Sequence, residues 1–173
     1  MNSWQRISTY NAADCYGRFW HAGLNNAGSL LFIASIDDDY AVWDIATSAC
    51  VWSSSDSDAL PALSGLLVDG FVDLQQPQVS DRFRVFGPEF NHFLRYYCRD
   101  HIDYDSLTGD VIVDTYIAND RDRQRLDFEG DANEWVQASF SDDGSIIAVM
   151  NPHYLSVFHR TSDGPVAQHG FYA

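Results

Sequence analysis

The stretch Phe140-Ser141-Asp142-Asp143-Gly144-Ser145-Ile146-Ile147-Ala148-Val149 combines a turn signal with a strand signal. In Ser-Asp-Asp-Gly, aspartate side chains can accept hydrogen bonds from nearby backbone amides and glycine tolerates a positive φ, so the chain can reverse sharply. The apolar run that follows suits a strand buried on both faces. The stretch therefore predicts a tight turn that leads into a buried strand of an antiparallel sheet.

Two other segments align with this one. The first runs from Asn25-Asn26-Ala27-Gly28-Ser29 through an apolar strand and the turn Asp37-Asp38-Asp39 to a strand containing Trp43-Asp44, and Asn151-Pro152-His153 and Tyr154 take the later positions in the last segment. A middle segment matches less well. It aligns Tyr104-Asp105-Ser106-Leu107-Thr108-Gly109 with Trp43-Asp44-Ile45-Ala46-Thr47-Ser48 without a gap. The strand expected before it runs from Phe93 to Cys98. The alignment predicts repeated strand-turn-strand units.

Period-two alternation recurs along the chain, and no long stretch keeps an apolar stripe at helical spacing, which predicts an all-β protein. We expect one domain, residues 1–173, with repeat units at about 18–53, 83–117 and 135–169. Residues 54–82 are expected to be an irregular link, in which 59–72 could form one short helix. Each unit reads as an antiparallel meander of about four strands, too small to be stable alone.

These units resemble the blades of the WD-repeat β-propeller family. Trp43-Asp44 is the best match to the Trp-Asp pair of that family, Tyr104-Asp105 is a conservative variant and Phe158-His159 departs from it, while the family's Gly-His element is absent. The resemblance implies a partial or irregular β-propeller. Because rings usually have four to eight blades, we expect either a shortened stack of sheets or two copies that pair through edge strands.

Charge narrows the choice of partner. The chain has 25 acidic and 10 basic residues, a formal net charge of −15, and every basic residue is arginine. Such a field repels phosphate backbones and anionic lipid, which disfavours nucleic acid and membrane partners, and it steers a basic protein surface toward the chain. A GC-rich or salt-adapted source would also explain the acid and arginine usage.

Location and chemistry follow from what the sequence contains. The apolar runs are far shorter than the roughly 20 residues of a membrane span, and three widely spaced cysteines without a Cys-x-x-Cys pair fit buried thiols in a reducing cytoplasm. We find no catalytic signature and expect no enzyme, cofactor or metal. The nearest metal candidates are His101, Asp103 and Asp105 on one strand face, and Asp37-Asp38-Asp39 as a calcium turn.

The remaining features are those of a protein-binding surface. Acidic loops with aromatic anchors, to which Trp20 and Trp52 could contribute, have the composition of a hot spot for a basic protein. The residues expected to bind are Asp37, Asp38, Asp39, Glu129, Asp131, Trp135, Asp142, Asp143 and Tyr154.

Three functions fit this description. The first is a protein-binding module, in its sharpest form an acidic inhibitor that resembles immunity proteins in size and charge and neutralises a basic toxin enzyme. The second is a propeller-like scaffold subunit of a larger complex, with homo-oligomers formed through edge strands. The third is a metal-dependent hydrolase that uses Asp and His on the blade loops.

Overall fold

The computed structural model describes residues 3–14, 17–54, 62–89, 93–105, 107–117, 120–128 and 134–161. Within these ranges the protein is all-β, with three open antiparallel sheets, one 3-10 turn (η1, Ala12–Asp14) and one short helix (α1, Leu63–Leu66). The helix lies inside the stretch where the sequence predicted one. No helix in the described ranges has the length and apolar character needed to cross a bilayer.

The first sheet has the order β5-β4-β3-β2-β8-β7-β6. Its strands are β2 (Phe19–Asn25), β3 (Leu30–Ser35), β4 (Tyr40–Asp44), β5 (Ala49–Ser54), β6 (Leu67–Val68), β7 (Phe71–Gln76) and β8 (Val79–Phe86).

The middle sheet has the order β1-β15-β14-β13, and the outer sheet has the order β12-β11-β10-β9. Their strands are β1 (Ser3–Asn11), β13 (Gln137–Phe140), β14 (Ile146–Met150), β15 (Tyr154–Thr161), β9 (Tyr96–Tyr97), β10 (Asp100–Tyr104), β11 (Val111–Ile117) and β12 (Asp120–Arg125).

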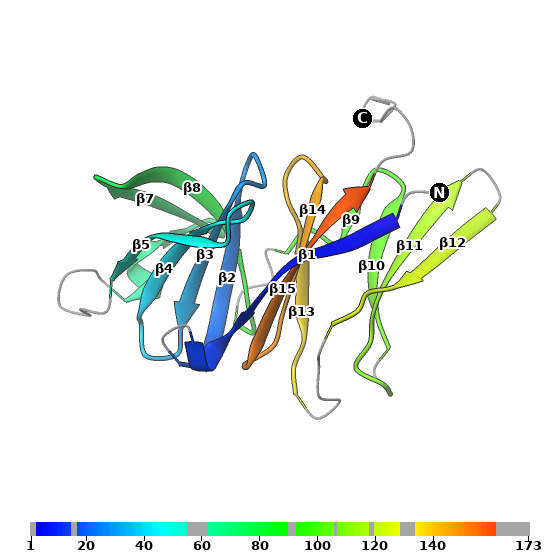
Figure 1. Cartoon of the computed structure of the whole chain (residues 1–173), viewed down its shortest axis with the longest axis horizontal. Helices are drawn as coiled ribbons and strands as arrows, with labels where there is room; N and C mark the ends of the chain where they lie inside the picture. Colours follow the sequence, from blue (N-terminus) through cyan, green and yellow to red (C-terminus); the bar gives the residue numbers. More distant parts are fainter. Residues whose placement is uncertain are drawn as a thin grey trace.

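The three sheets stand side by side, with the middle sheet between the other two (Figure 1). Every residue of β14 is buried. Because side chains alternate across a strand, Ile146, Ala148 and Met150 enter the core shared with the first sheet. Ile147 and Val149 enter the core shared with the outer sheet. The prediction of a strand buried on both faces is confirmed.

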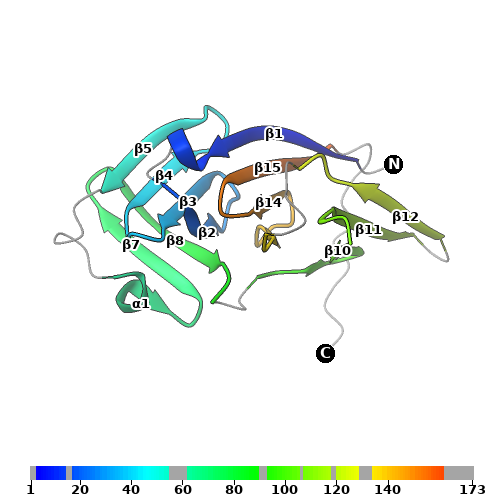
Figure 2. The ribbon, with the colours of Figure 1, turned by 90° about the horizontal axis from the view of Figure 1, so that it is seen from below.

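The first sheet also encloses a core of its own. Figure 2 shows it curved, with β7 and β8 opposite β4 and β5. Phe32 and Tyr40 on one side pack in one cluster with Val72, Phe83 and helix residue Leu63 on the other. The seven strands therefore form a half-barrel whose concave side is apolar.

The fourth strand of the middle sheet comes from the opposite end of the chain. β1 pairs antiparallel with β15 from Ser3 opposite Thr161 to Asn11 opposite Tyr154, with a bulge between Arg6 and Ser8. In Figure 1, β1 runs along the whole length of β15. Assembly of the middle sheet therefore needs both ends of the described chain.

The first and last segments fold alike. The amide of Gly28 donates to the carbonyl of Asn25 at 3.0 Å, and Gly144 donates to Ser141 at 2.9 Å. Both glycines have a positive φ, 63° and 68°. The two turns also touch, because a Cβ added to Gly28 would lie 3.0 Å from Ile146. The aligned turns thus occupy neighbouring positions in adjacent sheets.

The alignment of Asp44 with Asp105 also has a structural counterpart. The Asp44 carboxylate accepts from the backbone amide of Thr47 at 2.8 Å, and the Asp105 carboxylate accepts from the amide of Thr108 at 3.3 Å. The next residues, Ser48 and Gly109, both have a positive φ. The same turn chemistry therefore closes the β4–β5 and β10–β11 hairpins.

The predicted boundaries of the middle unit and of the link are wrong. Residues 83–86 belong to β8, which pairs with β2 and β7, and β12 completes the outer sheet instead. Residues 62–82 are not irregular, since they contain α1, β6, β7 and the start of β8. The preceding strand expected from Phe93 to Cys98 is only Tyr96–Tyr97. The apolar faces of β7 and β8 explain the difference, because they complete the concave core.

Gly144 offers a test of how tightly the middle and outer sheets fit. A Cβ at this position would lie 2.0 Å from Cδ1 of Tyr97 in β9, whereas a Cβ at Gly17, which also has a positive φ, would meet nothing within 4 Å. We expect Gly17→Ala to cost about 1 kcal/mol from backbone strain and Gly144→Ala to cost about 1–3 kcal/mol more from overpacking. Urea unfolding measures both, and equal losses would contradict this packing.

Candidate functional site

The lower edge of the stack in Figure 1 brings together residues from distant parts of the sequence. The rings of Trp20, in β2, and Trp135, just before β13, meet edge to face with centroids 5.9 Å apart. Beside them, His153 Nε2 lies 2.9 Å from Glu134 Oε1. The backbone carbonyl of His153 accepts from Ala12, which joins this turn to η1. We call this group, with the Asp37-Asp38-Asp39 turn, the lower edge.

The Asp37-Asp38-Asp39 turn is held by its own side chains. Ser35 Oγ accepts from the amides of Asp37 and Asp39 at 3.2 and 3.1 Å. Asp38 has a φ of 59°, and its Oδ1 accepts from the Tyr40 hydroxyl and from the amide of Leu63. Asp38 therefore orients helix α1, while Asp37 is exposed and Asp39 half-buried.

His21 lies behind this surface as a buried, uncharged base. Its side chain is 3% exposed, and burial lowers its pKa to about 4 although the nearby Asp38 charge opposes that shift. The contact of His21 with Trp20 and its electrostatic coupling to Asp38 connect the aromatic pair with the acidic turn. The lower edge thus has a neutral buried imidazole at physiological pH.

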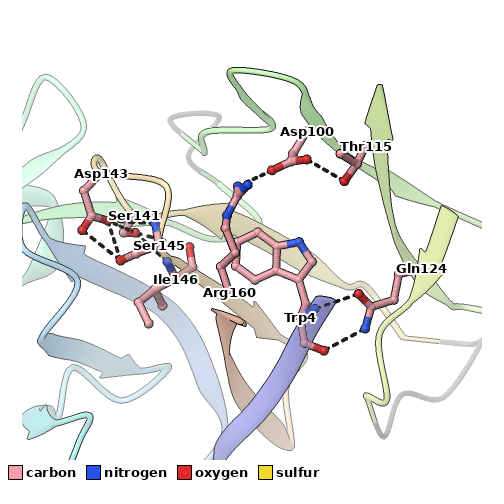
Figure 3. A network of polar contacts seen from close by, with 9 residues as sticks. All are labelled: Trp4, Asp100, Thr115, Gln124, Ser141, Asp143, Ser145, Ile146 and Arg160. Carbon is pink, nitrogen blue, oxygen red and sulfur yellow. Dashed lines mark hydrogen bonds and ion pairs between the residues drawn. The ribbon is translucent and has the colours of Figure 1, made fainter. Parts of the chain in front are cut away.

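Two predicted residues lie elsewhere. Asp142 and Asp143 are in the β13–β14 turn, at the opposite end of β14 from His153 and Tyr154. Asp142 accepts from Arg84 Nε at 2.6 Å, which ties β8 to the middle sheet. Asp143 accepts from the hydroxyls of Ser141 and Ser145 at 2.6 and 2.8 Å (Figure 3). These two carboxylates hold a turn at the other end of β14, so they do not lie together with Asp37 on the lower edge.

The other predicted residues have mixed outcomes. Trp135 and Tyr154 are half-buried and lie on the lower edge. Trp135 also packs against the core between the first and middle sheets. Trp52 packs against the concave core of the first sheet, away from that edge. Glu129 and Asp131 lie outside the described residues.

A buried ion pair joins the middle and outer sheets (Figure 3). Arg160 of β15 donates to Asp100 of β10, whose other oxygen accepts from Thr115 Oγ1 at 2.6 Å. The Arg160 guanidinium lies 4.7 Å from the centroid of the Trp4 ring. Gln124 of β12 binds the backbone of Trp4 twice, with both distances 2.7 Å. These contacts position β1 and the outer sheet around β15.

In the described structure, the residues proposed as metal ligands from the sequence, and the cysteines, are not arranged as a metal site. Within the described ranges, no three His, Cys, Asp or Glu side chains gather where they could hold a metal ion. His101 and Asp103 project from the side of the outer sheet that points away from the middle sheet, and the Asp105 carboxylate accepts hydrogen bonds within its own turn. Cys50 and Cys98 are exposed free thiols rather than the buried ones expected.

Sequence reasoning missed the partners that connect the lower edge. Trp20 and Trp135 are separated by more than a hundred positions, and the Glu134 and His153 pair spans a hairpin. No sequence motif links the two members of either pair, so only the pairing of the strands brings them together. Arg84 was also missed as the residue that neutralises Asp142.

Comparison with known proteins adds no relative. The sequence matches no protein-family model and no curated protein. The function of the lower edge is therefore interpreted from its own geometry and charge.

The lowered pKa of His21 makes the stability of the fold depend on pH. Protonation favours the unfolded chain, where histidine has its ordinary pKa of 6.5. The stabilisation is therefore complete above that value and decreases as the pH falls to about 4, by up to about 3 kcal/mol. We expect His21→Gln to flatten the free energy of unfolding between pH 7 and pH 4.5. The same slope in both proteins would exclude His21 as the cause.

The Asp100–Arg160 pair can be compared with an exposed pair. Both side chains are nearly buried, at 1% and 12% exposure, whereas those of Asp73 and Arg82 are 58% and 57% exposed. Asp100→Ala leaves a buried guanidinium without its charge partner, so we expect a loss of about 3–5 kcal/mol. Asp73→Ala should cost less than about 1 kcal/mol. Chemical denaturation measures both, and similar losses would refute a role of the buried pair in joining the sheets.

Proposed function

We propose that this protein is a non-enzymatic protein-binding module, and most specifically an acidic inhibitor of the immunity type that covers a basic partner protein. The observation that carries the proposal is the arrangement of acids and aromatic rings along the lower edge. The partner would be a protein with a basic surface, such as a toxin enzyme, and both would meet in the cytoplasm.

Charge supports the choice of partner. Acids lie on this side of all three sheets, with Asp37 and Asp39 in the β3–β4 turn, Glu134 before β13 and Asp105 in the β10–β11 turn. Several arginines are occupied elsewhere by carboxylates, as Arg84 is by Asp142 and Arg160 is by Asp100. The net charge of −15 therefore acts mainly through surface acids, which attract a basic protein and raise its association rate.

The aromatic pair supports a binding role. Trp20 and Trp135 are half-buried and lie beside Glu134 and His153. A large ring with partial exposure gains much contact area when a partner removes it from water, which is why tryptophan is enriched among energetically dominant interface residues. A surface with rigid rings surrounded by acids fits a basic protein better than a small substrate.

We further infer that the chain is related to propeller blades, in an irregular form. The turns at Gly28, Cys98 and Gly144 occupy one common edge, opposite the lower edge (Figure 1). This arrangement supports the inference, because successive blades of a propeller also place equivalent turns on one side of the ring. Loops on the other side are then free to bind.

Affinity capture from the native source tests the proposed function. The immobilised protein is incubated with an extract of the native source at 50 mM and at 500 mM salt. The proteins that it retains are identified by mass spectrometry. We expect one predominant protein of high pI, released by salt because its long-range attraction is screened. Proteins of low pI, or retention that does not change with salt, would overturn the proposal.

Matched charge variants locate the binding surface. The triple variant Asp37→Asn, Asp39→Asn, Glu134→Gln removes three charges from the lower edge, and the control Asp73→Asn, Asp120→Asn, Asp122→Asn removes three elsewhere. With the captured partner, we expect the first variant to lose at least about tenfold in affinity, some 1.4 kcal/mol, and the control to lose much less. Equal losses would remove the lower edge from the interface.

A further inference from the structure

The outer sheet has one face that nothing in the described structure covers. The other face of this sheet points toward the middle sheet and contributes Ile102, Val111 and Val113 to the core between the two sheets. The alternate residues of the same strands point away from it, and this face lies at the end of the stack in Figure 1. Tyr96 and Tyr116 on it are 70% and 46% exposed. We call the side chains on this side of β9 to β12 the free face.

The strand register arranges the free face in rows across the sheet. In one row, Asp103 of β10 lies opposite Ile112 of β11, which lies opposite Arg125 of β12. In the next row, His101 lies opposite Asp114, which lies opposite Arg123. In these two rows β11 is therefore a central line, with arginines on the β12 side and an acid and aromatic rings on the β10 side. Arg125 also pairs with Asp110 of its own chain at 2.7 Å. Next to Tyr116, whose amide donates to the carbonyl of Arg99, the β10 side carries an arginine as well.

The aromatic side of this face is built by two stacked rings. Tyr96 and His101 lie parallel, 4.3 Å apart with an interplanar angle of 9°. On the opposite side, Arg121 and Arg123 both donate to Asp114, which is fully buried. Burial would raise the pKa of Asp114, but these hydrogen bonds lower it to about 2, so the carboxylate stays charged and fixes both guanidiniums.

We propose that the free face binds a second copy of this chain, face to face about a two-fold axis that runs along β11. Such an axis exchanges the two sides of the face. Asp103 of one copy then faces Arg125 of the other, and Arg123 faces the Tyr96–His101 stack, on which a guanidinium can pack. Ile112, Asp114 and Tyr116 lie on the axis, each toward its own equivalent, as residues do in an isologous interface, and Asp114 is covered there by Arg121 and Arg123.

Charge favours a second copy over other occupants. The exposed arginines would face a basic partner with like charge. A second copy is different, because in the rows of Asp103 and His101 the two sides complement each other across the proposed axis. This inference goes beyond the proposed function and uses a separate surface, since the lower edge remains open in such a dimer.

Charge exchange tests the proposal. At 150 mM salt and protein concentrations up to the millimolar range, we expect sedimentation equilibrium to show a reversible dimer of the 19.5 kDa chain. Asp103→Arg and Arg125→Asp should each weaken it at least about tenfold, because every dimer then contains two like-charged pairs. The control Glu89→Arg makes the same charge change as Asp103→Arg at an exposed position just after β8 and should have little effect.

Mixing the two single variants separates a lost contact from a folding defect. In the mixed dimer, the two introduced side chains face each other with opposite charge, and the native Arg125 of one chain faces the native Asp103 of the other. We therefore expect the mixture to dimerise more tightly than either variant does alone. A monomeric wild type would show that the free face is a polar cap. Single variants that dimerise like the wild type, or a mixture that stays monomeric, would also overturn the proposal. Binding of a fluorescent single-stranded RNA by the monomer would assign the face to nucleic acid instead.

Discussion

The structure depends on a central strand that is apolar on both sides. β14 supplies Ile146, Ala148 and Met150 to one core and Ile147 and Val149 to another. Neither core exists without it, because each is closed by a different face of the same sheet. That sheet in turn needs β1, which comes from the start of the chain and pairs along the length of β15. Folding to this arrangement therefore requires contacts between the two ends of the described chain.

Arginine side chains neutralise the carboxylates that the fold buries in its interior. Carboxylates that must be buried, such as Asp100 and Asp114, are each bound by guanidiniums. Arginine suits this role, since its planar fork binds a carboxylate through two hydrogen bonds and does not lose its charge. The other acids in the described ranges are exposed or half-buried, where water solvates them. The same distribution provides the negative surface on which the proposed function rests.

The two ends of the sheet stack differ in a way that bears on assembly. The first sheet fills its concave far side with its own strands and helix α1. The outer sheet has no such cover in the described ranges, and its free face is polar and aromatic, with Asp103 and Arg125 at opposite ends of one row. A dimer through this face and a basic partner on the lower edge are compatible, because the two surfaces are built by different residues.

The sequence by itself determined the strand class, the short helix, the turns at Gly28, Asp44, Asp105 and Gly144, and the doubly buried β14. Each of these depends on neighbouring residues: an aspartate or serine that binds the amides beside it, a glycine with a positive φ, and the period of the apolar side chains. Local chemistry of this kind can be read without a tertiary structure.

Only the tertiary structure decided which strands share a sheet and which surface residues meet. The pairing of β8 with β2, the closure by β1 and the meeting of Trp20 with Trp135 all join distant segments. Such contacts form because they bury two apolar faces against each other. From the sequence alone, many other pairs of strands could bury their apolar faces equally well. The separation of Asp142 from Asp37 also depends on tertiary structure. The sequence does not show at which end of the sheet stack each turn lies, because that depends on how the hairpins pack against one another.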